Sequence, residues 1–193
     1  MTEGQIHSNR GRTMEPNDFL INNLNKLRKG KTLDLSPSTH SNSAFLSSQG
    51  FTMVEKVKNM DFFVLPIMSF DSIIMSYFNP VSRYWFDIKR GLVQGGTILI
   101  ENYTTDIFSL DHHPDVEPKD CFKPNELLQH LQGLRILFYQ EITAGKSAFV
   151  QCLAKKPYEK DALKYGFATS GSTDTVTSTS GHAKKAEDLF KKK

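Results

Sequence analysis

Residues 33–51 read LDLSPSTHSNSAFLSSQGF, and this stretch decides the predicted fold. The apolar–Asp–apolar triplet at residues 33–35 predicts a short buried strand. Residues 41–49 predict a helix with an apolar centre, and Gly50 is the usual kind of residue at a helix C-terminus. The loop between strand and helix is Ser-Pro-Ser-Thr-His at residues 36–40. The chain therefore contains a strand–loop–helix unit of the kind that builds α/β proteins.

In nucleotide-binding α/β units this loop is rich in glycine, so that backbone N–H groups approach the ligand at the helix N-terminus. Residues 33–51 resemble motif I of class I S-adenosylmethionine-dependent methyltransferases, most closely the tellurite-resistance (TehB-like) type, whose pattern is roughly LDLGxGxGRNAxFLAxxGF. The residues shared with that pattern are Leu33, Asp34, Leu35, Asn42, Phe45, Leu46, Gly50 and Phe51. Ser36, Ser38 and His40 stand at the three glycine positions.

The resemblance continues along the chain and covers about residues 17–157. Residues 61–74 resemble the family's DxFxLPxxSFDxII, and residues 91–104 resemble its segment with GG followed by ExyT. Residues 122–127 resemble LKPNEL, and residues 134–157 resemble the final strand pair. The order and spacing of these motifs carry the assignment.

The resemblance implies an α/β, Rossmann-like methyltransferase fold, with a mostly parallel sheet and a C-terminal antiparallel hairpin. Apolar patterns place helices at 17–28, 80–92 and 125–131, and strands at 51–57, 70–77, 97–102, 134–141 and 147–154. Almost no residues separate Val57 from the motif at Asp61, where the family has a helix and a third strand. Because a parallel crossover needs about a dozen residues, that unit is predicted to be deleted and the sheet shortened at one edge.

Three regions are predicted: a disordered lead at 1–16, a methyltransferase-like domain at 17–157, and a flexible tail at 158–193. The tail is rich in Lys and, between residues 166 and 182, in Ser and Thr, so it lacks the apolar surface to fold alone. Residues 155–193 hold nine Lys and five Asp or Glu, whereas the rest of the chain holds 15 Lys or Arg and 16 Asp or Glu. A nearly neutral domain argues against a nucleic-acid-binding face.

The family resemblance also locates a cofactor site for S-adenosylmethionine. The candidate cofactor residues, vestigial or weak, are Asp34, Ser36, Ser38, His40, Glu55 and Asp61. Val57 stands where the family has its ribose-binding acid, so Glu55 could replace that acid only if the strand ended sooner. An equally good interpretation of Asp34 is a strand-end residue that caps the loop.

The expected substrate side follows the next two strands and comprises Tyr77, Asn79, Glu101 and Tyr103. No catalytic residue is assigned. Residues 111–121 contain potential metal ligands but lack the spacing of a zinc site, so no metal is expected.

Three functional hypotheses follow. The leading one is a degenerate, non-catalytic binding or scaffold module with weak or no cofactor binding. The alternative is an active S-adenosylmethionine-dependent methyltransferase acting on a small thiol or oxyanion. The third is association with itself or another protein through the exposed sheet edge, aided by a patch of Phe51, Met53, Phe62, Phe63 and Ile67. With two cysteines and no apolar span, a cytoplasmic protein is expected.

Overall fold

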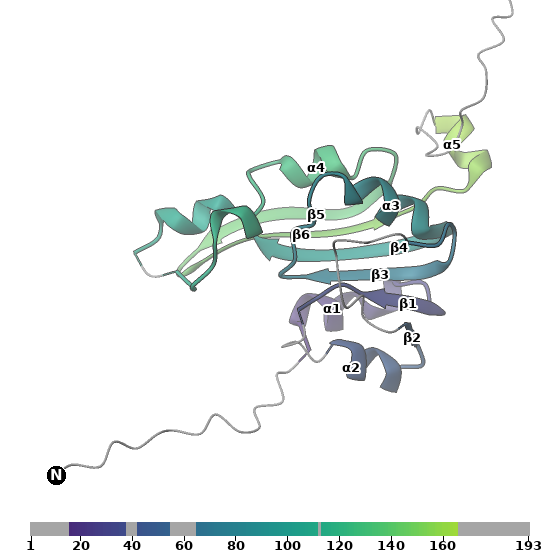
Figure 1. Ribbon diagram of the computed structural model, residues 1–193, viewed down its shortest axis with the longest axis horizontal. Coiled ribbons are helices and arrows are strands. Elements are labelled where there is room, and N and C mark those ends of the chain that lie inside the picture. Colours follow the sequence, from purple (N-terminus) through teal and green to yellow (C-terminus); the bar gives the residue numbers. More distant parts are fainter. Residues whose placement is uncertain (1–15, 38–41, 55–64, 112, 166–193) are drawn as a thin grey trace, which may run out of the picture.

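The computed structural model describes residues 16–37, 42–54, 65–111 and 113–165. Six strands form one sheet in the order β2-β1-β3-β4-β6-β5 (Figure 1). The strands are β1 (Lys31–Asp34), β2 (Thr52–Val54), β3 (Phe70–Ser76), β4 (Leu92–Tyr103), β5 (Arg135–Ala144) and β6 (Ser147–Lys155). β2, β1, β3 and β4 are parallel neighbours, whereas β6 runs antiparallel to both β4 and β5. The predicted fold class, with its C-terminal hairpin, is confirmed.

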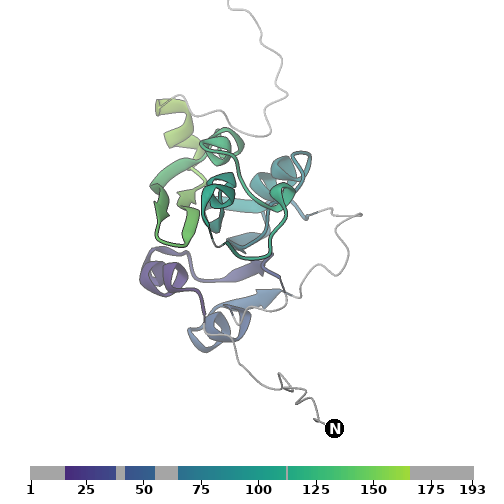
Figure 2. The ribbon, with the colours of Figure 1, turned by 90° about the vertical axis from the view of Figure 1, so that its left-hand side faces the viewer.

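Short helices flank this sheet. They are α1 (Asp18–Asn23), α2 (Asn42–Ser48), α3 (Tyr84–Gly91), α4 (Glu126–His130) and α5 (Glu159–Tyr165), with 3-10 turns at Leu24–Lys26, Thr105–Ser109 and Pro118–Asp120. Figure 2, turned by 90° from Figure 1, shows α1 and α2 grouped beside β1 and β2, away from α3 and α4. The sheet therefore has helices on both sides, as its apolar strands require.

The central strands are apolar on both faces because each face packs under a different helix group. Ile73 and Met75 of β3 belong to a buried cluster with Trp85 of α3. Ile74, between them in sequence, belongs to a second cluster with Leu20 of α1 and with residues of α2. Successive side chains of a strand point to opposite faces, so the run IIM fits a strand buried on both sides.

The helices are shorter than predicted. The helix expected at 80–92 begins only at Tyr84, since residues 81–84 form a turn in which the Tyr84 N–H donates to the Val81 carbonyl at 2.9 Å. The helix expected at 17–28 becomes a 3-10 turn from Leu24. β4 is longer than expected: it begins at Leu92, and its pairing with β3 is interrupted around Gly95, whose φ is +76°. Gly95 thus lies at a bulge within one strand, and the prediction at 97–102 missed the five residues from Leu92 to Gly96.

Among the described residues, β2 has only three residues and pairs only with β1, which agrees with the predicted loss of the next strand. Residues 55–64, where Glu55, Phe62 and Phe63 fall, lie outside the described part. The predicted apolar patch near this edge is wrong for Phe51, which is 4% exposed and packs in the α1–α2 cluster. Ile67 is exposed, and Met53 is half-buried against the same cluster. The predicted lead and most of the predicted tail also fall outside the described residues.

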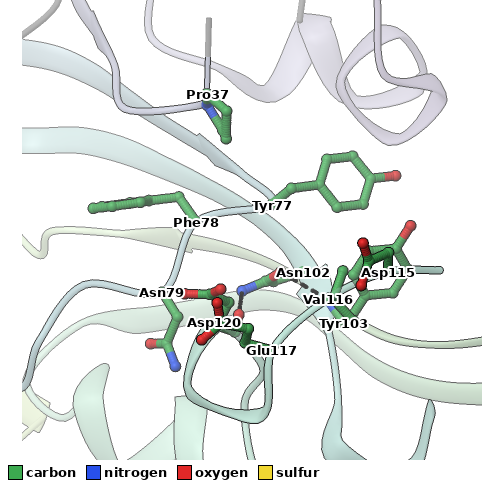
Figure 3. Close-up of a pocket in the computed structure, with 10 residues that line it drawn as sticks. All are labelled: Pro37, Tyr77, Phe78, Asn79, Asn102, Tyr103, Asp115, Val116, Glu117 and Asp120. Carbon is green, nitrogen blue, oxygen red and sulfur yellow. Dashed lines mark hydrogen bonds between the residues drawn. The ribbon is translucent and has the colours of Figure 1, made fainter. Parts of the chain in front are cut away.

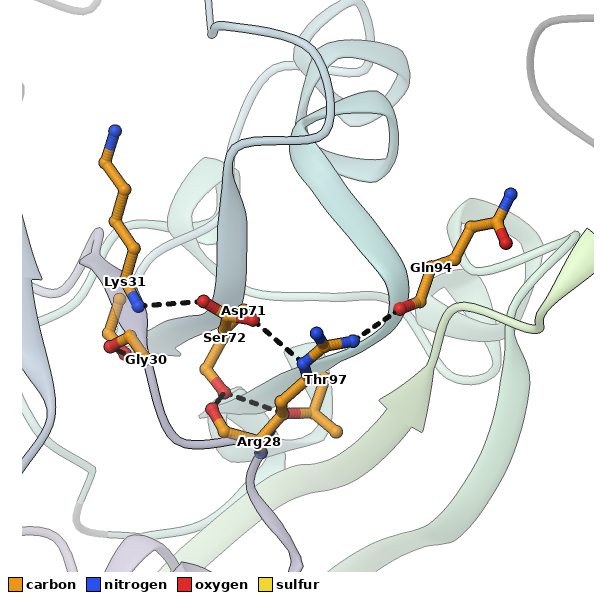
Figure 4. A network of polar contacts seen from close by, with 8 residues as sticks. Arg28, Gly30, Lys31, Asp71, Ser72, Gln94 and Thr97 are labelled. Carbon is orange, nitrogen blue, oxygen red and sulfur yellow. Dashed lines mark hydrogen bonds and ion pairs between the residues drawn. The ribbon is translucent and has the colours of Figure 1, made fainter.

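At the amino ends of the parallel strands, a polar network around Asp71 joins β1, β3 and β4 (Figure 4). The Asp71 carboxylate accepts from the Lys31 N–H at 2.9 Å and pairs with the Arg28 Nε at 2.8 Å. The Ser72 hydroxyl donates to the Arg28 carbonyl at 2.7 Å and lies 2.8 Å from the Thr97 hydroxyl. These contacts fix the chain that enters β1 against the starts of two neighbouring strands.

Candidate functional site: a closed crevice and an open cavity

The carboxyl ends of β1, β3 and β4 meet where the strand order reverses. From β1 the chain proceeds outward to β2, and then crosses back to β3 on the other side of β1. In open α/β sheets the crevice outside the strand ends at such a switch point is where ligands bind. Asp34 ends β1, Ser76 ends β3 and Glu101 lies near the end of β4, so these three side chains define the crevice.

Ser36 closes the crevice between β1 and β3. Its hydroxyl oxygen accepts a hydrogen bond from the Ser76 backbone N–H at 2.9 Å and another from the Asn42 side-chain amide at 3.3 Å. The residue is 4% exposed. A glycine at this position, as in the family pattern, would have no atom to make either bond. The serine side chain therefore bridges two strand ends through the space that a glycine would leave open.

The Asp34 carboxylate accepts hydrogen bonds from the loop after β1 and from α2. One carboxylate oxygen accepts from the Ser36 N–H at 2.9 Å, and the other accepts from the Ser43 hydroxyl at 2.7 Å. The side chain is 1% exposed. The carboxylate thus holds the loop after β1 and the first turn of α2 together. This geometry favours the interpretation of Asp34 as a structural cap over that of a ligand contact.

Asn42 links the crevice to α1 and was not singled out as a site residue by the sequence. It is fully buried, and its amide donates to the hydroxyls of Ser36 and Ser76, the latter at 3.2 Å. Its carbonyl oxygen accepts from the Asn17 N–H at 3.3 Å. Asn17 also caps α1 by accepting from the Leu20 N–H at 3.1 Å. The helix before β1 is thereby tied to the strand ends.

Glu101 is a buried carboxylate, 7% exposed, that receives hydrogen bonds from neutral groups. One oxygen accepts from the Asn17 amide and from the Tyr77 hydroxyl, the latter at 3.1 Å; the other accepts from the Gln151 amide. No ion pair involves Glu101 within the described part of the chain. The sequence did not predict that Asn17 and Gln151 bond to Glu101, because they are 84 and 50 residues away along the chain and no local pattern relates them.

Beside the closed crevice lies an open cavity of about 450 Å³ (Figure 3). We call it the acceptor-side cavity, since it lies where the sequence placed the substrate. Its lining residues are Pro37, Tyr77, Phe78, Asn79, Asn102, Tyr103, Asp115, Val116, Glu117 and Asp120. Three of the four predicted substrate-side residues, Tyr77, Asn79 and Tyr103, are in this lining. The fourth, Glu101, does not line the cavity and instead bonds to Tyr77.

Two asparagines hold the far wall of the cavity in place. The Asn79 amide donates to the carbonyls of Lys119 and Cys121 at 3.3 and 3.1 Å. The Asn102 amide donates to the Asp120 carbonyl at 2.8 Å. Residues 119–121 are therefore fixed against the ends of β3 and β4, although the carboxylate side chains of the segment 115–120 are exposed.

The two tyrosines of the cavity form an aromatic pair. Their ring centroids are 5.2 Å apart and the rings are tilted by 42°. Tyr77 has a φ of +54°, uncommon for a bulky residue, which places its ring beside Tyr103. Burial and then the Glu101 carboxylate raise the pKa of Tyr77 far above that of a free phenol, and the same two causes raise the pKa of Tyr103. Both rings therefore carry neutral hydroxyl groups near neutral pH.

Comparison with known proteins identifies the fold. No protein-family model and no curated protein matches this chain. A SAM-dependent methyltransferase from Methanosarcina mazei aligns over 76% of this chain and 100% of its own, with a TM-score of 0.56 and 14% identity. A putative methyltransferase from Listeria monocytogenes aligns over 72% of this chain and 97% of its own, with a TM-score of 0.54 and 10% identity. The fold is that of S-adenosylmethionine-dependent methyltransferases.

One further structure of this fold contains a cofactor product. A 1,6-didemethyltoxoflavin N1-methyltransferase from Burkholderia thailandensis, solved with 1,6-didemethyltoxoflavin and S-adenosylhomocysteine, aligns over 72% of this chain and 76% of its own. Its TM-score is 0.53 and its identity 14%. In the present chain, Ser36, Asn42 and Asp34 form hydrogen bonds with one another and with Ser43, Ser76 and Asn17. These side chains do not fit the amino-acid end of S-adenosylmethionine, which needs an open glycine loop there.

The remaining predicted cofactor residues, Ser38, His40, Glu55 and Asp61, lie outside the described residues. In the part of the chain that the structure describes, no group of three His, Cys, Asp or Glu side chains is arranged to hold a metal ion. Within the same residues, no helix combines the length and apolar character needed to cross a membrane.

Proposed function

We propose that this protein is a degenerate, methyltransferase-like binding module with weak or no binding of S-adenosylmethionine and no methyl transfer of its own. The observation that carries this proposal is the hydrogen bond from the Ser76 N–H to the Ser36 hydroxyl, which joins the ends of β1 and β3 across the crevice. To admit a cofactor there, the protein would have to break this bond and those of Asn42, and would leave buried polar groups unpaired.

Support comes from the neighbouring acid as well. The Asp34 carboxylate already has a partner on each oxygen, so it offers little to a ligand amino group. The family pattern combines an acid with glycines. This chain keeps the acid as Asp34, which here caps the loop, and has Ser36 in place of a glycine. The scaffold is retained while the requirement for the cofactor is relaxed.

Calorimetric titration of the full chain with S-adenosylmethionine and with S-adenosylhomocysteine tests the proposal. The expected result is no saturable heat at micromolar ligand, with the Methanosarcina mazei methyltransferase titrated in parallel as the positive control. Thermal unfolding gives an independent readout, because a ligand that binds only the folded state raises the unfolding temperature with concentration. Micromolar binding with a matching thermal shift would contradict the proposal.

The second candidate is an active methyltransferase of the tellurite-resistance type, acting on a small thiol or oxyanion. The observation that favours it is the acceptor-side cavity, which stays open and keeps Tyr77 and Tyr103 at its wall. Transfer of a labelled methyl group to small-molecule acceptors tests it directly. If transfer is found, Asp34→Ala should abolish it; transfer that survives this change would remove Asp34 from the site.

We also infer a domain at 17–157, a tail at 158–193 that contains α5, and a cytoplasmic location. Cys121 and Cys152 are both free and buried, which suits a reducing compartment. Pairing through the short β2 edge remains a proposal for self-association, and light scattering at high concentration tests it: a monomer throughout would contradict it.

A further inference from the structure

The acceptor-side cavity has a chemistry that selects one class of ligand. Its volume of about 450 Å³ lies within the usual range for small-molecule sites. Its walls combine the rings of Tyr77, Phe78 and Tyr103 with three carboxylate side chains from the segment 115–120. No Lys or Arg is among the lining residues. Aromatic faces beside carboxylates attract a positively charged group and repel an anion.

Two of the three carboxylates are available to such a ligand. Glu117 pairs with Lys119 at 2.7 Å, so its charge is partly balanced within the chain. No ion pair involves Asp115 or Asp120 among the described residues. The Asn102 amide holds the backbone of Asp120, so this part of the wall is anchored while its carboxylate stays exposed. The rim of the cavity therefore carries two carboxylates that form no ion pair within the described residues, although the positive charge of Lys119 lies near Asp120.

The inner wall is also negative. The Tyr77 hydroxyl donates to the buried Glu101 carboxylate, whose donors among the described residues are all neutral. The Glu101 carboxylate behind the Tyr77 ring and the carboxylates at the rim all make the electrostatic potential in the cavity negative. The tyrosine pair, with ring centroids 5.2 Å apart, adds two negative ring faces at the same place. Because aromatic faces suit a large, diffuse cation better than a small hydrated metal ion, the expected ligand is organic.

We propose that the acceptor-side cavity binds a small organic ammonium ion, held between the Tyr77–Tyr103 ring pair and the carboxylates of Asp115 and Asp120. This inference deepens the proposed function, on which it rests, by naming the ligand class of the binding module. The cofactor crevice and the cavity are lined by different side chains, apart from Tyr77 and Pro37 at their border. The two claims can therefore fail separately.

The experiment is a titration of the full chain at low salt with choline and with its neutral isostere, 3,3-dimethyl-1-butanol. Choline is expected to bind at least about tenfold more tightly than the isostere, since only choline carries the charge that the rings and carboxylates attract. Added salt is expected to weaken the binding of choline and to leave the isostere unchanged. Equal affinity of the two compounds, or no binding of choline at millimolar concentration, would overturn the proposal.

Variants separate the two parts of the site. Asp115→Asn with Asp120→Asn should weaken choline binding about three- to tenfold, and because both side chains are exposed, the thermal stability should not change. Glu159→Gln, at an exposed acid on α5 away from the cavity, is the matched control and should change neither choline binding nor stability. Unchanged affinity in the Asp115/Asp120 double variant would exclude the carboxylates from the site.

The ring pair is tested separately. Tyr103→Leu should weaken choline binding, whereas Tyr103→Phe, which keeps the ring, should not.

The same samples are titrated with S-adenosylhomocysteine, which lacks the sulfonium charge. If both this compound and choline bind, the proposed loss of the cofactor site is wrong and the cation site stands as an acceptor pocket. If neither binds, the cation inference alone is refuted.

Discussion

Replacing Ser36 by Ala tests whether its hydroxyl closes the crevice. The change removes the acceptor of the Ser76 N–H and one of the two hydroxyl acceptors of the Asn42 amide. Ser76 and Asn42 are fully buried. A buried donor left without a partner costs about 1–3 kcal/mol, so Ser36→Ala should lower the free energy of unfolding by about that amount. For a domain of this size, where 1 kcal/mol shifts the unfolding temperature by about 2–4 °C, the unfolding temperature should fall by about 2–12 °C.

Urea denaturation with matched thermal unfolding measures this loss. Ser69→Ala is the control, because the only bond of the Ser69 hydroxyl within the described residues goes to the Ile67 carbonyl at an exposed position. This change should alter stability by less than about 0.5 kcal/mol. If Ser36→Ala behaves like this control, the Ser36 hydroxyl does not bridge the strand ends and the reasoning for a closed crevice is refuted.

Three further changes follow from the structure. Gly30→Ala should destabilise the protein by about 2 kcal/mol or more in urea denaturation, since φ is +142° and a Cβ would lie 2.2 Å from the Asp71 carboxylate; an unchanged midpoint would contradict this. Burial raises the pKa of Cys152 to about 12, so the native protein binds more protons there than the unfolded chain, and stability should fall as pH rises from about 9 toward 12. Cys152→Ala should flatten that fall, and a thiol that reacts with Ellman's reagent in the folded protein at pH 9 would contradict the burial. Glu101→Ala should lower the pKa of Tyr77, measured by ultraviolet titration, because it removes a neighbouring negative charge; an unchanged pKa would place Glu101 elsewhere.

The sequence predicted the fold well because each strand carries its own signal. The apolar run in β3 is continuous, as burial on both faces requires, and the Gly145 turn between β5 and β6 makes a hairpin. Element ends were less predictable. β4 starts earlier than the Gly95–Gly96 pair suggested, since a glycine bulge and a glycine turn look alike in sequence.

The candidate site was predicted in part. The sequence showed that Ser36 replaces a glycine of the family pattern and offered a loop cap as one interpretation of Asp34. The structure brings both residues into one hydrogen-bonded cluster. The sequence missed the roles of Asn17 and Gln151, which reach Glu101 from positions 84 and 50 residues away. Pairings at such separations depend on the packing of the whole sheet. The loss of glycine was visible in sequence, but the new bond that replaced it was not.

The acidic wall of the cavity illustrates the same limit. Asp115 and Asp120 belong to a loop of mostly exposed residues. The amides of Asn79 and Asn102, together with the backbone bond from the Phe122 N–H to the Tyr103 carbonyl, bring this loop against Tyr103. Each residue is unremarkable alone. The cavity chemistry arises from four segments that the fold places together.

The measurement that tests the central claim most directly is the calorimetric titration of the full chain with S-adenosylhomocysteine. A crevice closed by Ser36 and Asn42 predicts no saturable binding at micromolar ligand and no rise in unfolding temperature. A saturable isotherm at micromolar ligand, with a matching rise in that temperature, would contradict it.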